Sequence, residues 1–442
     1  MGENGTTSKT TASDFIATRR SLLKTAATMG LAVMAPGVLA QGLQKSSQGE
    51  SGGYVYIGTY TGPHTAPGGT QPSKAKGIYV YKTEGDTGNL TPIQVVEAEN
   101  PSFLAMSPAN NHLYCVNELG TDDAGAPLGR VSAYRIEQSS GQLTLINTQS
   151  TKGAWPCHCW VHPTGKYLFA ANYGTGDFAV FPILPDGGIG EMTDLYRTPG
   201  NSTGADPVRQ EGPHAHMILT NHGAQHVFGV DMGTDQILIW DFALDTGKLT
   251  PNTVPFATVP SGAGCRHMVF DPDDKFAYVL NELSSTIDAF RFDAARGAFI
   301  WTDSASTLPD DTQFVRPSFD ASNPGKVPSG TNTTAEIRVH PTGQWVYATN
   351  RGMDSVAIFA VDHAKGRLTP IGWVSSQGAI PRGMNLDPSG TFLYVGNQNC
   401  DVIAVFRINA DSGMLEGPVH TIDSPVPVDF AFSAVASTQR ST

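Results

Sequence analysis

A four-part pattern recurs along the chain and limits its fold more than any other feature. Each copy holds an apolar segment, a turn, an aromatic-rich segment and a polar pair, as residues 265–283 illustrate. A further alternating segment follows each copy, and a Gly turn such as those at Gly247 and Gly366 follows several. Short alternating segments bounded by turn residues are typical of β-strands. The pattern therefore predicts repeated units of four antiparallel strands.

The polar pair gives the phase of this repeat, whose period of roughly 50 residues is the size of a propeller blade. The first residues of the six pairs are Asn117, Asn172, Val230, Asn281, Asn350 and Asn397. The chain ends supply a seventh unit, because Tyr54–Thr59, 77–81 and 90–96 match three strands and Pro427–Phe432 matches the missing one. We predict an all-β fold, a seven-bladed β-propeller with four antiparallel strands per blade. Pairing of the N- and C-terminal strands would close the ring and leave no open edge.

The N-terminal segment carries features of an export signal rather than of the fold. Arg19 and Arg20 precede an apolar stretch at 26–38, and Val38-Leu39-Ala40 forms a small-residue cleavage site. This order of segments indicates a twin-arginine signal. We predict an export signal at 1–40, a linker at 41–53, the propeller at 54–436 and a tail at 437–442. The twin-arginine export machinery would then be a partner, and the protein would be periplasmic or extracellular.

Composition excludes several classes of partner. The net charge is −12, which argues against nucleic acid. Beyond the leader there is no apolar run of about 18 residues, so we expect no membrane span once the signal is removed. The five cysteines are scattered, and the alternating Cys157-His158-Cys159 is typical of a buried strand rather than of a zinc site.

The phase of the repeat also predicts where a functional site lies. In every blade the start of the first strand and the end of the second strand fall on one face. The long irregular segments 61–76, 120–129, 200–212 and 304–333 rise from this face. Irregular segments of this length are usually functional. We expect them to wall a pocket over the central channel.

Two rings of side chains are predicted at this face. The second residues of the first strands are Ser102, Cys157, His214, Arg266, Ala335 and Arg382. The second residues of the polar pairs are Glu118, Tyr173, Asp231, Glu282, Arg351 and Gln398. A further group, His158, His216 and His267, is expected slightly deeper. Taken singly, each of these residues is as readily structural as functional. Taken together they favour function, because titratable groups that cluster in a cleft mark functional sites. A metal site is disfavoured, because the histidines fall on different blades or beside arginines.

Several motifs resemble one known family. They are GCRHMVF at 264–270 with NELSST at 281–286, AEIRVHPTG at 335–343 with NRG at 350–352, GPHAH at 212–216 and HPTG at 162–165. In this order they are similar to the seven-bladed β-propeller lactonases, which include propeller-type 6-phosphogluconolactonases and carboxymuconate lactonizing enzymes. The resemblance covers nearly all of 54–432. It departs from many relatives at Cys265, where they have Pro, and in the insertion 304–333.

The resemblance implies a site on the propeller axis that needs no metal or cofactor. Its catalytic groups would be Glu282, His214 and Arg266. Glu282 would take a proton from water, Arg266 with Arg351 would stabilise the oxyanion, and His214 would protonate the leaving ring oxygen. The substrate-binding residues would be Arg351, Arg382, His216, His267 and His158.

The expected activity is hydrolysis of a small sugar lactone. Two alternatives stay open: a lactonizing enzyme that uses the same groups in reverse, and a non-catalytic propeller that binds a ligand. Export conflicts with a 6-phosphogluconolactone substrate, which is made in the cytoplasm. The natural substrate would then be an unphosphorylated sugar lactone, or the activity differs from that usual in the family.

Overall fold

The computed structural model describes residues 53–62, 73–200, 204–319 and 328–433. The predicted export signal, linker residues 41–52 and the predicted tail lie outside the described residues. The described residues form 28 β-strands in seven four-stranded antiparallel sheets. This confirms the prediction of a seven-bladed, all-β propeller. No described segment is a helix long and apolar enough to cross a membrane.

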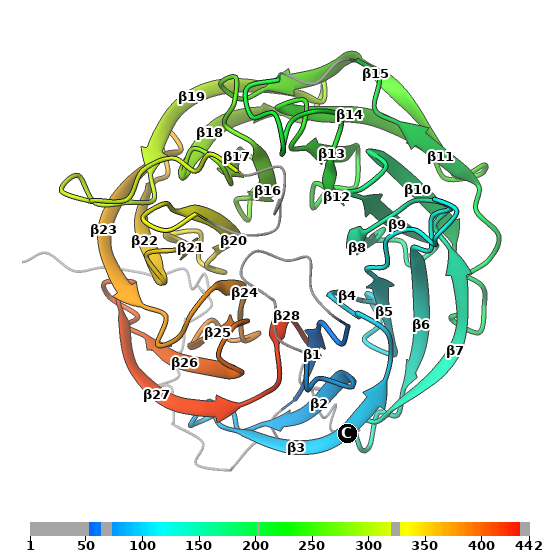
Figure 1. Cartoon of the computed structure of the whole chain (residues 1–442), viewed down its shortest axis with the longest axis horizontal. Coiled ribbons are helices and arrows are strands. Elements are labelled where there is room, and N and C mark those ends of the chain that lie inside the picture. Colours follow the sequence, from blue (N-terminus) through cyan, green and yellow to red (C-terminus); the bar gives the residue numbers. More distant parts are fainter. Residues whose placement is uncertain (1–52, 63–72, 201–203, 320–327, 434–442) are drawn as a thin grey trace, which may run out of the picture. The chain divides into compact units, whose positions relative to one another are not determined.

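Each blade contributes one strand to each of four concentric layers around a central axis (Figure 1). The innermost strands are β4 (Phe103–Met106), β8 (Pro156–Val161), β12 (Ala215–Thr220), β16 (Cys265–Phe270), β20 (Thr333–Val339), β24 (Pro381–Leu386) and β28 (Pro427–Phe432). The second strands are β1 (Tyr54–Thr59), β5 (His112–Asn117), β9 (Tyr167–Asn172), β13 (Val227–Asp231), β17 (Phe276–Asn281), β21 (Trp345–Arg351) and β25 (Phe392–Asn397).

The two outer layers complete the blades. The third strands are β2 (Gly77–Thr83), β6 (Arg130–Ile136), β10 (Asp177–Pro182), β14 (Gln236–Ala243), β18 (Thr286–Asp293), β22 (Ser355–Asp362) and β26 (Val402–Ile408). The outermost strands are β3 (Leu90–Glu97), β7 (Leu143–Ser150), β11 (Asp194–Arg197), β15 (Lys248–Thr258), β19 (Ala298–Ser306), β23 (Arg367–Ser375) and β27 (Leu415–Asp423).

The ring closes through pairing of its terminal strands, as predicted. β28 lies antiparallel to β1, with Val55 opposite Phe432 and Ile57 opposite Phe430. The seventh blade therefore has the strand order β28-β1-β2-β3. Among the described strands, β28 pairs with β1 alone and lies beside the innermost strands β24 and β4 of the two neighbouring blades, so the two ends of the propeller are joined within one sheet.

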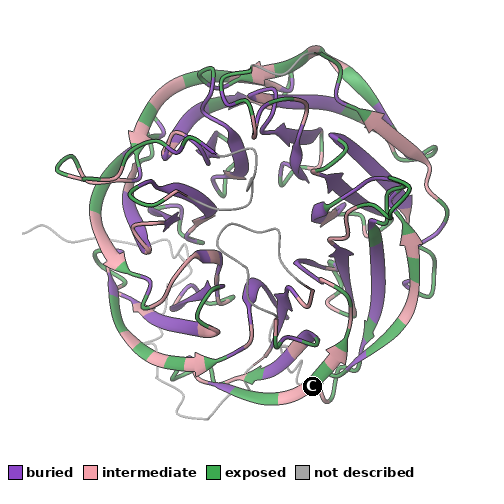
Figure 2. Cartoon of the chain, viewed as in Figure 1, coloured by how far each residue is buried: buried purple, intermediate pink, exposed green. Residues whose placement is uncertain are grey.

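Burial falls from the second strands to the outermost strands (Figure 2). Every residue of β9, β17 and β25 is buried. The outer strands β15 and β27 instead mix exposed and partly buried residues along their length. Strands covered on both faces are continuous apolar runs, whereas edge strands exposed on one side alternate. The core therefore lies between neighbouring sheets, where it holds the innermost strands in fixed positions around the channel.

A glycine in the turn between the third and outermost strands packs against the sheet of the preceding blade. Gly366 has a φ of +70°, and a Cβ on it would lie 2.2 Å from the ring of Phe276. Gly413 has the same φ, and a Cβ there would lie 2.3 Å from the ring of Trp345. Only glycine combines this left-handed backbone with so close an approach to an aromatic ring. These contacts explain why the Gly turn recurs in the sequence.

Candidate functional site

A β-bulge near the start of the innermost strand occurs in several blades and leaves one residue of that strand out of the pairing register. The register of β16 against β17 skips Arg266, between Cys265 and His267. Equivalent single-residue shifts occur at Cys157, His216 and Arg382. Bulges redirect side chains and are frequent beside functional sites. Cys157, Arg266 and Arg382 thus hold equivalent positions in their blades, as the repeat predicted, and their place at the channel stays a prediction.

The same register corrects the prediction for His214 and Asp231. Ala215 pairs with Asp231, just as Cys265 pairs with Asn281. The residue equivalent to Arg266 is therefore His216, two positions after the predicted His214. The same pairing puts Asp231 in the place of the first residue of a polar pair. Its Oδ1 accepts hydrogen bonds from the backbone N–H groups of His214 and Thr234.

The centre of the site is a buried carboxylate held by three guanidinium groups. Glu282 Oε2 lies 3.0 Å from Arg266 Nε and 2.9 Å from Arg351 Nη2. Its Oε1 lies 2.7 Å from Nη2 of Arg209. The side chains of Glu282 and Arg351 are each only 1% exposed. Glu282, Arg266 and Arg351 thus meet as the sequence predicted, and with Arg209 and Arg382 they form the group that we call the arginine rim.

Electrostatics keep Glu282 ionised. Burial alone raises the pKa of its carboxyl group, because a charged group loses hydration. Arg351, Arg209, Arg266 and Arg382 act in the opposite direction and together hold this pKa well below its usual range. Each oxygen of the carboxylate already accepts a hydrogen from a guanidinium group. Glu282 is therefore an anchor for arginines and a weak proton acceptor.

Arg209 is a central residue that the sequence analysis missed. It lies in the loop between β11 and β12, donates from Nε to the Tyr173 hydroxyl at 3.0 Å, and stacks over Phe319 at 4.8 Å. It follows no strand pattern, so the repeat could not place its side chain. The available signal was its position shortly before the GPHAH motif, among other charged residues.

His214 connects to the arginine rim through Tyr173. The two rings are stacked, with centroids 4.4 Å apart, and Tyr173 in turn contacts Arg209. His214 Nδ1 lies 2.9 Å from the Tyr173 carbonyl oxygen and so carries a hydrogen. Its Nε2 lies 3.1 Å from the half-exposed carboxylate of Glu211. This geometry suits an imidazole that gains and loses a proton at Nε2.

Arg382 differs from the other arginines of the rim because no carboxylate among the described residues pairs with it. Its guanidinium lies over the ring of Tyr60, 5.1 Å from the centroid. The Tyr60 hydroxyl donates to Glu118 Oε2 at 2.8 Å. Arg382 forms no hydrogen bond or ion pair with the residues that the structure describes. Its donors are thus available to a ligand.

A second layer of charged groups lies directly below the rim. His267 Nε2 lies 3.3 Å from Arg266 Nη1, and its Nδ1 lies 3.1 Å from Glu336 Oε1. Burial lowers the pKa of His267 to about 4, although Glu336 partly opposes this. His267 is therefore neutral near pH 7, accepting from Arg266 and donating to Glu336. Glu336 also pairs with Arg338, which extends the chain of contacts down the channel.

The remaining predicted histidines lie in or below this layer. His216 contacts Cys157, with 3.7 Å between Nδ1 and Sγ, and its ring lies 5.2 Å from that of His267. His158 lies 5.6 Å from His267, ring to ring, and lines a cavity on the far side of the channel from the rim. Burial lowers the pKa of both His158 and His216 well below the usual value. The three histidines are thus neutral at pH 7.

The rim carries an excess of positive charge. Four guanidinium groups, those of Arg209 and the three predicted arginines, face the carboxylates of Glu282 and Glu118. Such a site favours an anionic ligand or a negative charge that develops during a reaction. Across the residues that the structure describes, His, Cys, Asp and Glu side chains form no group of three or more placed to hold a metal ion.

The long segments predicted to wall the site are described only in part. Residues 63–72, 201–203 and 320–327 lie outside the described residues. Arg209 and Phe319 come from two of these segments and contact each other at the rim. A pocket over this end of the channel stays a prediction. Cys157 and Cys159 are buried strand residues, as predicted.

Fold and site together define a propeller with an arginine-lined channel, and comparison with known proteins gives its family. The family model for the lactonases with a seven-bladed β-propeller matches residues 54–432. The chain belongs to this family.

Named relatives include enzymes that act on sugar lactones. The chain is 31% identical to the 6-phosphogluconolactonase of Bacillus subtilis over 380 residues, which cover 85% of this chain and 97% of that protein. It is 28% identical to the 6-phosphogluconolactonase of Formosa agariphila over 324 residues, 72% of this chain and 84% of that protein. The solved structure of the periplasmic gluconolactonase of Pseudomonas aeruginosa matches with a TM-score of 0.76 and 28% identity, covering 87% of this chain and 99% of that one.

Proposed function

We propose that this chain hydrolyses a sugar lactone at the arginine rim. The observation that carries the proposal is the cluster of guanidinium groups around Glu282 in a member of the lactonase family. Relatives named 6-phosphogluconolactonase and gluconolactonase support the same reaction. Ester hydrolysis passes through a tetrahedral intermediate whose carbonyl oxygen becomes negative, and this is the charge that the rim is built to receive.

The arginines divide into anchored and available donors. Glu282 holds Arg266 and Arg351 through one nitrogen each, which leaves other N–H groups of both guanidiniums for a ligand. Nε of Arg351 is buried without a hydrogen-bond partner in the described part of the chain. We assign the lactone oxyanion to Arg266 and Arg351. Arg382, with no carboxylate partner, binds a substrate hydroxyl or the carboxylate of the product.

Proton transfer is assigned to His214. Its Nε2 takes a proton from the attacking water as the new C–O bond forms at the carbonyl carbon. The same nitrogen returns the proton to the ring oxygen when the ring C–O bond breaks, which gives a hydroxy acid. Glu282 was predicted to act as the base, but its contacts and its low pKa favour the role of anchor. The Glu211 carboxylate lies 3.1 Å from this nitrogen and helps to orient the imidazole.

Hydrolysis is favoured over the two alternatives. The two relatives are named 6-phosphogluconolactonase and gluconolactonase, and neither name refers to lactonization or to a non-catalytic role. For the substrate we propose an unphosphorylated sugar lactone such as gluconolactone. This choice agrees with the gluconolactonase named among the structural relatives.

We further propose that the protein is exported by the twin-arginine route. The proposal rests on the Arg19-Arg20 segment and on the apolar stretch that follows it. The similarity to a periplasmic gluconolactonase supports it. Fractionation of cells that express the full chain tests it: the protein should leave the cytoplasm, and Arg19→Lys with Arg20→Lys should retain it there.

A substrate panel measured in a pH-stat tests the activity itself. Each hydrolysed lactone releases a carboxylic acid, so base uptake counts turnovers. We expect turnover of gluconolactone above the spontaneous rate, and slower turnover of a muconolactone. If no lactone is turned over while one binds tightly, the ligand-binding alternative replaces this proposal.

A further inference from the structure

A cavity of about 640 Å³ lies at the end of the channel opposite the arginine rim. Pro108, Pro163 and His222, which belong to turns after innermost strands, contribute to its wall and fix its place. We call this space the lower cavity. None of the catalytic roles proposed above uses it.

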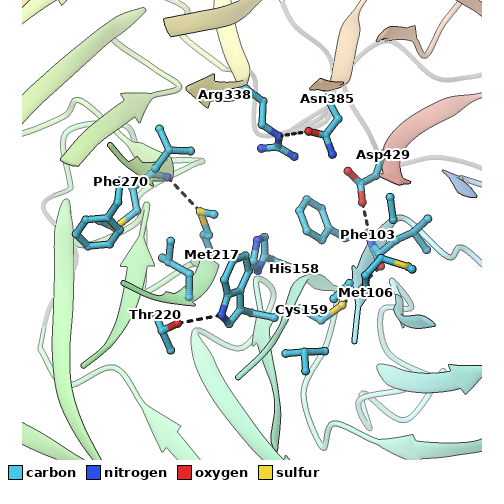
Figure 3. Close-up of a pocket in the computed structure, with 18 of the residues that line it drawn as sticks. Phe103, Met106, His158, Cys159, Met217, Thr220, Phe270, Arg338, Asn385 and Asp429 are labelled. Atoms are coloured by element: carbon cyan, nitrogen blue, oxygen red, sulfur yellow. Dashed lines mark hydrogen bonds between the residues drawn. The ribbon is translucent and has the colours of Figure 1, made fainter. Parts of the chain in front are cut away.

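The walls of the lower cavity are mostly apolar. They include Phe103, Trp160, Met217, Val269 and Phe270, which come from four different blades. Figure 3 shows Phe103, Met217 and Phe270 around a common space, with Arg338, Asn385 and Asp429 together on one side of it. Small-molecule sites typically have this composition, a largely apolar wall with a few convergent polar groups.

Arg338 is the charged group on the polar side. Its Nε donates to Asn385 Oδ1 at 3.0 Å, and its Nη1 pairs with Glu336. Asn385 is itself fixed, because its Nδ2 donates to the Phe430 carbonyl oxygen at 2.8 Å. These contacts hold the guanidinium plane in place. Nη2 has no partner in the described part of the chain, so its hydrogens remain available.

Asp429 and His158 add two further groups. Asp429 Oδ2 accepts the Leu104 backbone N–H at 2.8 Å, whereas its buried Oδ1 has no hydrogen-bond partner among the described residues. Burial raises the pKa of Asp429 to about 7, against the opposing effect of Arg338, so the neutral acid is well populated at pH 7. His158 Nδ1 accepts the Ile218 N–H at 3.4 Å, which leaves the hydrogen on Nε2.

We infer that the lower cavity is a second binding site, for a small organic acid with a planar apolar body. The guanidinium of Arg338, the imidazole N–H of His158 and the carboxylic acid of Asp429 all supply hydrogens, which suits the oxygens of a carboxylate. The aromatic and methionine side chains suit a flat apolar body. A sugar would instead place its hydroxyl groups against these apolar walls, where they lack partners.

Calorimetric titration of the full chain with benzoate tests the inference, and benzyl alcohol serves as a probe with the same ring but no carboxylate. We expect benzoate to bind with a Kd of about 1 mM or tighter, and benzyl alcohol at least about tenfold more weakly. Val269→Trp fills the cavity without removing a polar group and should abolish benzoate binding. Arg338→Gln should weaken it by about tenfold or more, and provides an independent result if Val269→Trp does not fold.

Arg382→Gln separates the two ends of the channel, because the arginine rim also attracts carboxylates. Benzoate affinity should change by less than about twofold in this variant. The inference is overturned if the unmodified protein does not bind benzoate, or if Val269→Trp and Arg338→Gln both leave its affinity unchanged. Loss of binding in Arg382→Gln would place the benzoate at the rim and would also overturn it.

Discussion

Replacing Glu282 by Gln removes a buried negative charge that contacts three guanidinium groups. The contacts to Arg209, Arg266 and Arg351 are 2.7, 3.0 and 2.9 Å long, and the carboxylate is 1% exposed. Breaking a buried ion pair by removing one partner costs about 3–5 kcal/mol of folding free energy, because the remaining charge is left uncompensated. In a domain of this size that corresponds to a fall in Tm of roughly 4–6 °C.

Glu118→Gln is the matched control, because Glu118 occupies the position of Glu282 in another blade. Glu118 accepts hydrogen bonds from the neutral hydroxyls of Tyr60 and Ser102, and a Gln carbonyl oxygen accepts the same bonds. We expect this control to lose less than about 1.5 kcal/mol. Thermal and denaturant unfolding of both variants at pH 7 measure the difference.

The pH dependence of kcat/KM distinguishes an anchor from a base. With its pKa held well below the usual range, Glu282 stays ionised near neutral pH and does not produce an acid limb there. Any residual activity of Glu282→Gln should therefore keep the acid limb of the unmodified enzyme, because Glu282 is not the group that produces it. The reasoning is refuted if the variant is as stable as the unmodified protein, or if the acid limb disappears with Glu282.

Three further substitutions test separate parts of the site. His214→Gln should lower kcat by about 10²–10⁴-fold while Tm changes little, and an unchanged kcat would contradict its role in proton transfer. Arg382→Gln should raise KM by about tenfold and affect kcat less, since Arg382 is assigned to substrate binding; an unchanged KM would contradict this. Asp429→Asn concerns stability. Burial raises the folded-state pKa to about 7, so the stability that Asp429 contributes below its unfolded pKa is lost as the pH rises through 7. Unfolding at pH 5 and pH 8 should therefore show the variant gaining stability over the unmodified protein as the pH rises, and an equal difference at both pH values would argue against it.

The blades could be predicted from the sequence because each one repeats the same pattern of strands and turns. Apolar alternation, a turn and an aromatic-rich strand recur, and the Gly turn recurs because it packs against an aromatic ring of the preceding blade. The terminal strands were identified by the same pattern, which is why ring closure was correct. Arg266 and Glu282 were placed for the same reason, since the polar pair fixes their phase.

Other parts of the site follow no periodic rule. In the blade of β12 to β15 the polar pair begins with Asp231 after an apolar Val230. The predicted polar pair was therefore one residue early, and in the first strand His214 was aligned in place of His216, two residues further on. Arg209 comes from a loop, and no spacing specifies how far a loop side chain reaches. Glu336, Arg338 and Asp429 lie on strands, but their role depends on contacts between blades that a single repeat does not contain.

Hydrolysis of gluconolactone by Arg266→Gln tests the central claim most directly. Arg291→Gln is the control, because Arg291 is an exposed residue of the same blade, on β18. Base uptake in a pH-stat should show kcat lowered by about 10²–10³-fold in Arg266→Gln, the effect of losing one oxyanion donor, and unchanged in Arg291→Gln. Circular dichroism at the assay temperature must show both variants folded. A folded Arg266→Gln that keeps the full rate, or an unmodified protein no faster than buffer, would contradict hydrolysis at the arginine rim.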